Sequence, residues 1–251
     1  MTRRGFLRQL TQGAIAASAV GEALASCTNQ AAVPAASRED GRPTVKPQAN
    51  STHSKQPAEI VLPPPDLASA VSLEEALSAR RSVRSFDDSM PIDLASIGQL
   101  FWAAQGVTRD WGGRTSPSAG ALYPLELYAA WDSGLYHYLP TGHRAEIVLA
   151  RDVRPALWEA GLHQASLAAA PAIFVVTAVQ QRTAVKYGDR ARRYVHVEVG
   201  HAAENLLLQA VSLGLGAVVI GAFHDAEVSA GLALPADQLP LYMIPVGHPI
   251  T

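Results

Sequence analysis

The pattern of apolar and polar positions divides the chain into three parts. Residues 1–27 combine an arginine-rich start with a short apolar run, whereas residues 28–66 are rich in Ala, Pro, Ser, Asn and Gln and show no hydrophobic period. Helical and strand periods appear only in residues 67–251. A segment without periodic apolar residues has no face to bury, so we expect a disordered tether at 28–66 and one folded domain at 67–251.

Apolar residues at helical spacing predict four helices in the folded part. The first begins at a capping box formed by Ser72 and Glu75, and the second begins at Asp93. The predicted ranges are 72–80, 93–106, 153–170 and 193–213. In the longest of these helices, the residues expected to lie mostly inside are Val197, His201, Leu206 and Leu208.

Alternating or fully apolar runs, separated by turn residues, predict six strands. Their ranges are 124–131, 135–138, 146–149, 172–178, 217–220 and 241–246. The run at 172–178 is almost entirely apolar, which is typical of a central strand. Because helices and strands mix without strict alternation, the pattern favours an α+β fold over a doubly wound α/β fold.

Charge and composition exclude one class of function. The formal net charge is −2, and the basic residues are scattered among acidic ones. A nucleic-acid-binding domain instead carries a strongly basic balance on one face. We therefore expect no nucleic-acid partner.

The first 27 residues resemble an export signal. Arg3 and Arg4 form a twin-arginine pattern, and the apolar run Gly13–Leu24 that follows is too short and too rich in Ala and Gly for a stable membrane span. Cys27 is the only cysteine, and it ends a Leu-Ala-Ser-Cys run that resembles a bacterial lipobox. We expect export by the twin-arginine route and a periplasmic or membrane-anchored lipoprotein attached through Cys27.

A cluster of cations and a hydroxyl follows the first predicted helix. Arg80, Arg81, Ser82 and Arg84 form this arginine segment. A guanidinium is a permanently charged fork of five N–H donors that matches a phosphate, and a hydroxyl adds one more donor. The segment therefore predicts a phosphate anchor for a nucleotide-like cofactor. Since cations also favour helix C-termini, a solvated basic helix end is the alternative.

Other polar residues have competing interpretations. Lys186 and Tyr187 lie in a polar segment before the longest helix, either as ordinary loop residues or as an ammonium and a phenol for proton transfer. His196, Glu198 and His201 are the candidate ligands of a metal site, but the two histidines lie roughly 140° apart around a helix and do not face one ion. A serine nucleophile at Ser118 lacks the glycine two residues earlier that an elbow turn needs.

Five motifs occur in an order that resembles one family. They are the arginine segment, the PSAGALYP loop at 117–124, Gly200-His201 followed by Asn205, the GLGAVVIGAF run at 214–223 and PVGHP at 245–249. With these motifs, about residues 67–251 resemble the nitroreductase superfamily and, within it, the SagB-type dehydrogenases that make thiazoles and oxazoles by oxidising azolines.

The resemblance implies an α+β fold with a central mixed or antiparallel sheet flanked by helices, in a homodimer with one FMN at each interface. It implies that the arginine segment holds the flavin phosphate and ribityl chain, that the 117–120 loop of the partner chain faces the ring, and that a backbone N–H of 219–221 lies near flavin N5. The implied cofactor-binding residues are Arg80, Arg81, Ser82, Arg84, Pro117, Ser118, Ala119, Gly120, Val219, Ile220, Gly221 and Gly247. Lys186 and Tyr187 match the catalytic proton-handling pair of azoline-oxidising relatives.

The function that follows is an FMN-dependent oxidoreductase that transfers hydride through flavin N5 to or from a small organic substrate. The electron partner stays open among NAD(P)H, a quinol and other carriers. Because reduced nicotinamides are scarce outside the cytoplasm, we expect an exported enzyme to dehydrogenate a substrate or to draw electrons from a quinol. The alternatives are a catalytically silent flavin-binding or envelope interaction module and a metal-dependent hydrolase.

Overall fold

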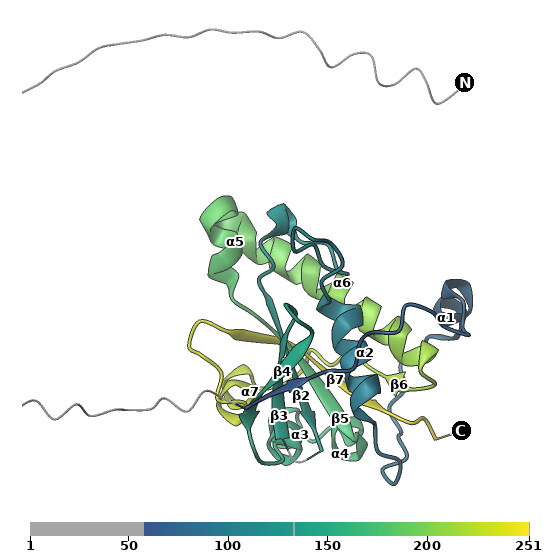
Figure 1. The fold of residues 1–251 in the computed structure, drawn as a ribbon. Helices are drawn as coiled ribbons and strands as arrows, with labels where there is room; N and C mark the ends of the chain where they lie inside the picture. Colours follow the sequence, from purple (N-terminus) through teal and green to yellow (C-terminus); the bar gives the residue numbers. More distant parts are fainter. Residues whose placement is uncertain (1–57, 133, 251) are drawn as a thin grey trace, which may run out of the picture. The chain divides into compact units, whose positions relative to one another are not determined.

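Seven strands form one sheet at the centre of the computed structural model, which describes residues 58–132 and 134–250. Neighbouring strands are all antiparallel, in the order β1-β4-β3-β2-β5-β7-β6 (Figure 1). The strands are β1 (Glu59–Val61), β2 (Leu125–Trp131), β3 (Gly134–Leu139), β4 (Arg144–Leu149), β5 (Ala172–Ala178), β6 (Gly216–Ala217) and β7 (Leu239–Gly247). The predicted α+β fold with an antiparallel sheet flanked by helices is confirmed.

The helices begin where side-chain caps satisfy their free amides. Ser72 Oγ accepts the Glu75 amide at 3.1 Å while Glu75 Oε2 accepts the Ser72 amide at 2.8 Å, which is the predicted capping box. Asp93 caps the second helix in the same manner, accepting the Ser96 amide at 2.8 Å. The helices are α1 (Leu73–Ala79), α2 (Leu94–Gln105), α3 (Arg154–Ala160), α4 (Ala165–Ala169), α5 (Gln180–Tyr187), α6 (Ala191–Ser212) and α7 (Asp225–Gly231), with 3-10 turns η1 (Ala119–Ala121) and η2 (Gly188–Arg190).

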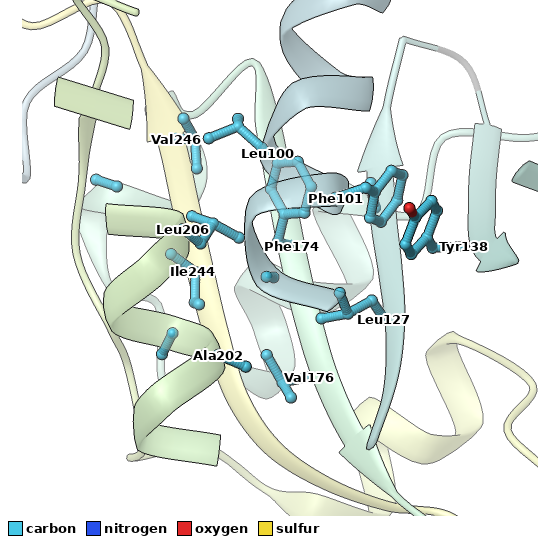
Figure 2. Packing of buried hydrophobic residues seen from close by; sticks show 14 of the residues in the cluster. Leu100, Phe101, Leu127, Tyr138, Phe174, Val176, Ala202, Leu206, Ile244 and Val246 are labelled. Atoms are coloured by element: carbon cyan, nitrogen blue, oxygen red, sulfur yellow. The ribbon is translucent and has the colours of Figure 1, made fainter. Parts of the chain in front are cut away.

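Helices cover both faces of the sheet because side chains alternate between the faces along each strand. One face buries Leu127, Phe174 and Ile244 against α2 and α6. The other face buries Ile173 and Val175 against α3, α4 and α7. Figure 2 shows the first of these cores, with α2 and α6 packed over the central strands. Each buried Leu, Ile or Phe stabilises the fold by roughly 1.5–3 kcal/mol, so the first of these cores fixes the position of α6.

The tether expected at 28–66 ends earlier than predicted. Ile60 of β1 pairs with Ala145 of β4, and Leu62 is only 3% exposed. A strand of three residues is too short for its alternation to appear in the sequence pattern. Residues 1–57, which contain the expected export signal, Cys27 and most of the tether, lie outside the described residues.

The helical predictions differ from the structure at α3 and α4, at α5 and at α7. The helix expected at 153–170 is divided into α3 and α4, because Gly161 ends α3 and Leu162 and His163 follow it with φ angles of 59° and 57°. That left-handed backbone cannot continue a right-handed helix. Helix α7 has no counterpart among the predicted helices, since its seven residues include only one buried side chain, Val228.

One face of α6 is turned away from the sheet. Leu206 is 0% exposed, as predicted, but Val197 is 50% exposed and His201 is also exposed, so their predicted inward positions are wrong. The buried positions of α6 follow the helical period on the side facing the sheet, and Val197 lies outside that stripe. In the described part of the chain, no helix has both the length and the apolar character of a membrane span.

Candidate active site

The arginine segment extends along the edge of the sheet. Ser82 forms a parallel bridge with Ala217 of β6, and the Val83 amide donates to the Ala217 carbonyl at 3.0 Å. This approach requires Gly216, because a Cβ atom there would lie 2.6 Å from Cγ1 of Val83. The backbone of the segment is therefore fixed while its polar side chains reach solvent.

The charges of the arginine segment are only partly neutralised. Arg80 Nε lies 3.3 Å from Oε1 of Glu204 on α6. Arg81, Ser82 and Arg84 are exposed, and neither Arg81 nor Arg84 forms an ion pair within the described residues. A cavity of about 170 Å³ lies between the segment, the end of α6 and β6. Arg80 and Arg81 line this cavity, and the free guanidinium of Arg81 is suited to an anion there.

Residues 218–221 continue the edge strand beyond β6. The amides of Val218 and Ile220 donate to carbonyls of β7 at 3.4 and 2.8 Å. The Ile220 amide is therefore already bonded to β7, and the predicted N–H near flavin N5 would have to come from Val219 or Gly221. Strand amides alternate in direction, so those of Val219 and Gly221 point toward the open edge that the arginine segment joins. Among the described residues neither amide has an acceptor.

Gly247 has a packing role in the structure. A Cβ atom there would lie 2.8 Å from Cβ of Phe86 and 2.8 Å from Cδ of Pro171. Phe86 follows the arginine segment and forms an antiparallel bridge with Pro249. The glycine thus lets β7 pass beneath Phe86 and helps to anchor the segment. Contact between Gly247 and a cofactor stays a prediction.

The loop at 117–120 is held against α6 by a buried carboxylate. Glu198 is only 5% exposed, and its Oε1 accepts the Ala119 amide at 2.8 Å. Burial raises the pKa of Glu198, and the hydrogen bonds from Ala119 and Ser118 reduce that rise without cancelling it. Gly120 has φ 64°, a left-handed conformation that glycine adopts without strain. Glu198 thus fixes the loop on the side that faces α6.

Lys186 and Tyr187 lie beside this loop, at the end of α5. The prediction of a polar loop here is wrong, because the segment is helical. A Cβ atom on Gly120 would lie 3.0 Å from both Lys186 Nζ and the Tyr187 hydroxyl. The Tyr187 ring packs edge-on against Tyr194 of α6, with centroids 4.9 Å apart. The ammonium and the phenol therefore meet at one point over the loop, as a proton-transfer pair requires.

A half-buried carboxylate, that of Glu126, positions α5. Glu126 of β2 forms an ion pair with Arg182 of α5, and its Oε2 lies 2.7 Å from Nε2 of His137. Burial acts to raise the pKa of Glu126, but the His137 hydrogen bond and the Arg182 charge outweigh it, so the pKa lies below its usual value. Arg182 also donates to the Tyr123 carbonyl at 3.3 Å. Since Arg182 precedes Lys186 by about one helical turn, these contacts orient the lysine.

The sequence alone did not predict which residues hold the 117–120 loop in place. Glu198 looks like a possible metal ligand in the sequence, but among the described residues no cluster of potential metal ligands is present. Asn205 lies two turns after Glu198 and donates to Ser116 Oγ at 3.0 Å, so one face of α6 holds both ends of the loop. One signal was present in the sequence: Glu198 is an acidic residue within the apolar stripe of a helix. A carboxylate buried at such a position needs a hydrogen-bond partner.

The two groups of site residues lie toward opposite ends of α6. Arg80 contacts Glu204, whereas Tyr187 contacts Tyr194 ten residues earlier, about 15 Å along the helix axis. Figure 1 shows α1, which precedes the arginine segment, and α5 beside different ends of α6. A single chain therefore brings Lys186 and Tyr187 to the 117–120 loop but does not bring the arginine segment to them.

Comparison with solved structures finds the same fold in oxidoreductases and in a biosynthetic complex. A nitroreductase crystal structure from Ralstonia eutropha matches with 31% identity and a TM-score of 0.68, covering 78% of this chain and 94% of that one. The Escherichia coli microcin synthetase McbBCD complex matches with 25% identity and a TM-score of 0.59, covering 76% and 79%. The NADPH:FMN oxidoreductase of Vibrio harveyi shares the fold at 24% identity and a TM-score of 0.54, covering 71% and 69%.

Sequence comparison identifies the family. A protein of Methanocaldococcus jannaschii named as a nitroreductase is 42% identical over 186 residues, which is 72% of this chain and 92% of the relative. The sequence model of the nitroreductase family matches residues 77–248, from α1 to the end of β7. That range contains both groups of site residues. The chain therefore belongs to the nitroreductase family.

Proposed function

We propose that the chain is an FMN-dependent oxidoreductase of the SagB type that works as a homodimer. The observation that carries this proposal is the placement of two complementary groups toward opposite ends of α6. A two-fold axis across α6 reverses the helix in a second copy, so the arginine segment of one chain meets the loop, Lys186 and Tyr187 of the other. The dimer then has two composite sites, each with a phosphate anchor and a proton-transfer pair.

The donors of the arginine segment fit FMN. Arg81 and Arg84 offer charged forks and Ser82 a hydroxyl to the phosphate, while the unpaired amides of Val219 and Gly221 offer neutral donors along the same edge. A hydrogen bond to a charged group contributes roughly 1.5–3 kcal/mol. The NADPH:FMN oxidoreductase that shares this fold supports the choice of flavin.

FMN, when bound, supplies hydride transfer through its N5 atom. The chain's own contribution is to position the reactants and to move protons. Lys186 and Tyr187 deliver a proton to, or remove one from, the substrate over Gly120. The microcin synthetase complex, whose structure holds truncated pro-MccB17, supports the SagB type. In that case the substrate would be dehydrogenated, and its electrons would leave the site to a second acceptor.

The first test is the absorption spectrum of the purified full chain, with the released cofactor identified by mass. We expect bands near about 370 and 450 nm and the mass of FMN. A colourless protein that does not take up added FMN would contradict the proposal and leave the arginine segment as a solvated helix end.

The dimer rests on exposed apolar side chains around α1 and α6. Leu67, Leu73 and Leu77 are 80%, 61% and 53% exposed, and Val197 is 50% exposed. An apolar surface of this kind marks an interaction site. In sedimentation, Val197→Glu is expected to give monomers that lose FMN, whereas Val61→Glu on the edge strand β1 keeps the dimer. A wild-type chain that is monomeric with FMN bound would rule out the composite site.

The electron partner and the location of the enzyme complete the proposal. We propose export by the twin-arginine route, attachment through Cys27, and electron exchange with a quinol rather than NAD(P)H. In rapid mixing, an oxidised quinone analogue, which becomes the quinol, is then expected to restore the flavin band of the reduced enzyme faster than NAD⁺ does. Replacing Arg3 and Arg4 by lysine is expected to retain the protein in the cytoplasm, and Cys27→Ser to release it from membranes. Fast reduction by micromolar NADH argues against the quinol.

A further inference from the structure

The start of α6 and the helix before it carry an excess of positive charge. Residues 180–193 contain five cations and one carboxylate, in a chain whose formal net charge is −2. The cations are Arg182, Lys186, Arg190, Arg192 and Arg193, and the carboxylate is Asp189. Cations are unfavourable near a helix N-terminus, where the backbone already presents partial positive charge. Lys186 lies in the last turn of α5, where a cation is favourable, but helix stability does not explain Arg190, Arg192 and Arg193 at the start of α6.

Two of these cations are interleaved with aromatic rings. Lys186 Nζ lies 5.5 Å from the centroid of the Tyr187 ring, and Tyr187 packs edge-on against Tyr194. The Arg190 guanidinium lies 5.5 Å from the centroid of the Tyr194 ring, and its Nε donates to the Tyr194 hydroxyl at 3.0 Å. We call these four residues the basic aromatic cluster. Gly120 of the candidate active site lies directly beside it.

The positive charge of the cluster is not neutralised within the chain. Arg182, one turn before Lys186, is paired with Glu126. Within the described residues, no ion pair joins Lys186 or Arg190 to a carboxylate. Glu198, the nearest buried acid on this face of α6, is directed at the Ala119 amide behind the loop. An anion at the cluster would relieve the repulsion between the two free cations.

We propose that the basic aromatic cluster binds the anionic group of a flat, conjugated substrate and directs that substrate to the candidate active site. This inference rests on the proposed function. Lys186 and Arg190 supply the charge, and the Tyr187 and Tyr194 rings supply flat contact surface. The substrate class is thus a conjugated carboxylate, or another planar anion of similar size. Neutral compounds of the same shape lose the charge contribution and bind more weakly.

The test uses the FMN-loaded wild-type enzyme and two probes that differ in charge, 4-nitrobenzoate and 4-nitrobenzamide. Binding to the oxidised enzyme is measured by calorimetry at low and high salt. We expect the benzoate to bind about three- to tenfold more tightly than the benzamide, with the difference shrinking in high salt. Reoxidation of the dithionite-reduced enzyme is the second readout. There the nitro group takes up two electrons and two protons, becoming a nitroso group with release of water.

The variant Arg190→Gln is expected to weaken benzoate binding about three- to tenfold and to change benzamide binding less than about twofold. Arg190→Lys keeps the charge and is expected to retain most of the preference. Arg151→Gln removes another exposed arginine, between β4 and α3, and is the matched control. Its preference is expected to equal that of the wild type.

Several outcomes overturn the inference. Equal affinity for the two probes contradicts it, as does a preference that salt does not reduce. The same is true if Arg190→Gln weakens both probes equally or if Arg151→Gln matches its effect. A chain that never takes up FMN removes the proposed function and this inference together. If the enzyme binds FMN but reduces both probes at equal rates, the inference is wrong while the proposed function stands.

Discussion

The two ends of α6 hold their functional groups by different physical means. Near the C-terminal end, the backbone of the arginine segment is fixed by pairing with Ala217 and by the absence of a side chain at Gly216. The cations themselves extend into solvent. Near the N-terminal end, carboxylates hold the elements that carry or adjoin Lys186 and Tyr187: the half-buried Glu126 pairs with Arg182 of α5, and the buried Glu198 accepts the Ala119 amide of the adjacent loop.

The difference indicates what each end has to do. An anion anchor works by charge and tolerates some freedom in its long side chains, so a fixed backbone is sufficient. Proton transfer requires a donor within about 3 Å of the reacting atom, so side-chain positions must be fixed. The same distinction predicts that damage to one end leaves the function of the other largely intact, which variants at each end can test.

The largest effect is expected for FMN affinity. Arg81→Gln and Arg84→Gln each remove a charged donor and are expected to weaken FMN binding about ten- to a hundredfold. Lys186→Gln is expected to leave FMN affinity within about twofold of wild type while lowering turnover. Titration of the apoprotein with FMN, followed by quenching of flavin fluorescence, measures all three. Equal losses at both ends would show that the ends do not have separate functions.

The next effect concerns the backbone of the arginine segment. Gly216→Ala places a Cβ atom against Val83 and is expected to cost about 1–3 kcal/mol in the free energy of unfolding. Adding Val83→Ala removes Cγ1 and Cγ2 but leaves Cβ, which would lie 2.7 Å from the new methyl group, so it is expected to recover only part of the loss in FMN affinity. Chemical denaturation and FMN titration of the two single variants and the double variant measure the coupling. Additive losses would mean that the contact does not position the segment.

A smaller effect is expected at the opposite end. Gly120→Ala combines a left-handed backbone with a Cβ atom 3.0 Å from Lys186 Nζ and from the Tyr187 hydroxyl. The backbone strain costs about 1–2 kcal/mol, and displacement of the two side chains is expected to lower turnover while FMN affinity stays the same. Gly200→Ala, with φ in the helical range of α6, controls for the substitution itself. If turnover were unchanged in Gly120→Ala, Lys186 and Tyr187 would not take part in catalysis.

The two ends also differ in how much of their structure the sequence alone predicts. Capping at Ser72 and Asp93 and the apolar run of β5 are local signals, so the start of α1 and α2 and the centre of the sheet were predictable. The pairing of Ser82 with Ala217 joins residues far apart in the chain and was not. The assignment of Lys186 to a loop failed because a helix of eight residues with few apolar side chains has little period to detect.

The roles of Glu126 and Glu198 depend on partners that only the fold brings together. Glu126 finds Arg182 from α5 and His137 from β3, and Glu198 finds the Ala119 amide. No spacing in the sequence encodes these contacts. The resemblance to the nitroreductase family located the motifs, but it did not indicate which residues hold them in place.

The two glutamates give the final prediction, because their pKa values shift in opposite directions. The pKa of Glu126 is lowered from 4.5, so its contribution to stability is present above that pH and is lost as the pH falls through the folded-state pKa. The pKa of Glu198 is raised from 4.5, so the folded state binds the proton more tightly. Its contribution therefore becomes unfavourable as the pH rises from 4.5 through the folded-state pKa.

Neutral variants should separate the two effects. At pH 7, Glu126→Gln is expected to lower the free energy of unfolding by about 1 kcal/mol, a moderate loss because Arg182 is partly exposed, and the loss should shrink below pH 4. Glu198→Gln keeps an acceptor for the Ala119 amide and removes the buried charge, so its stability relative to wild type should rise as the pH increases from 4.5. Denaturation of both variants between about pH 3 and 8 measures this. If both differences changed in the same direction with pH, the two carboxylates would not be held in the opposite ways that the structure shows.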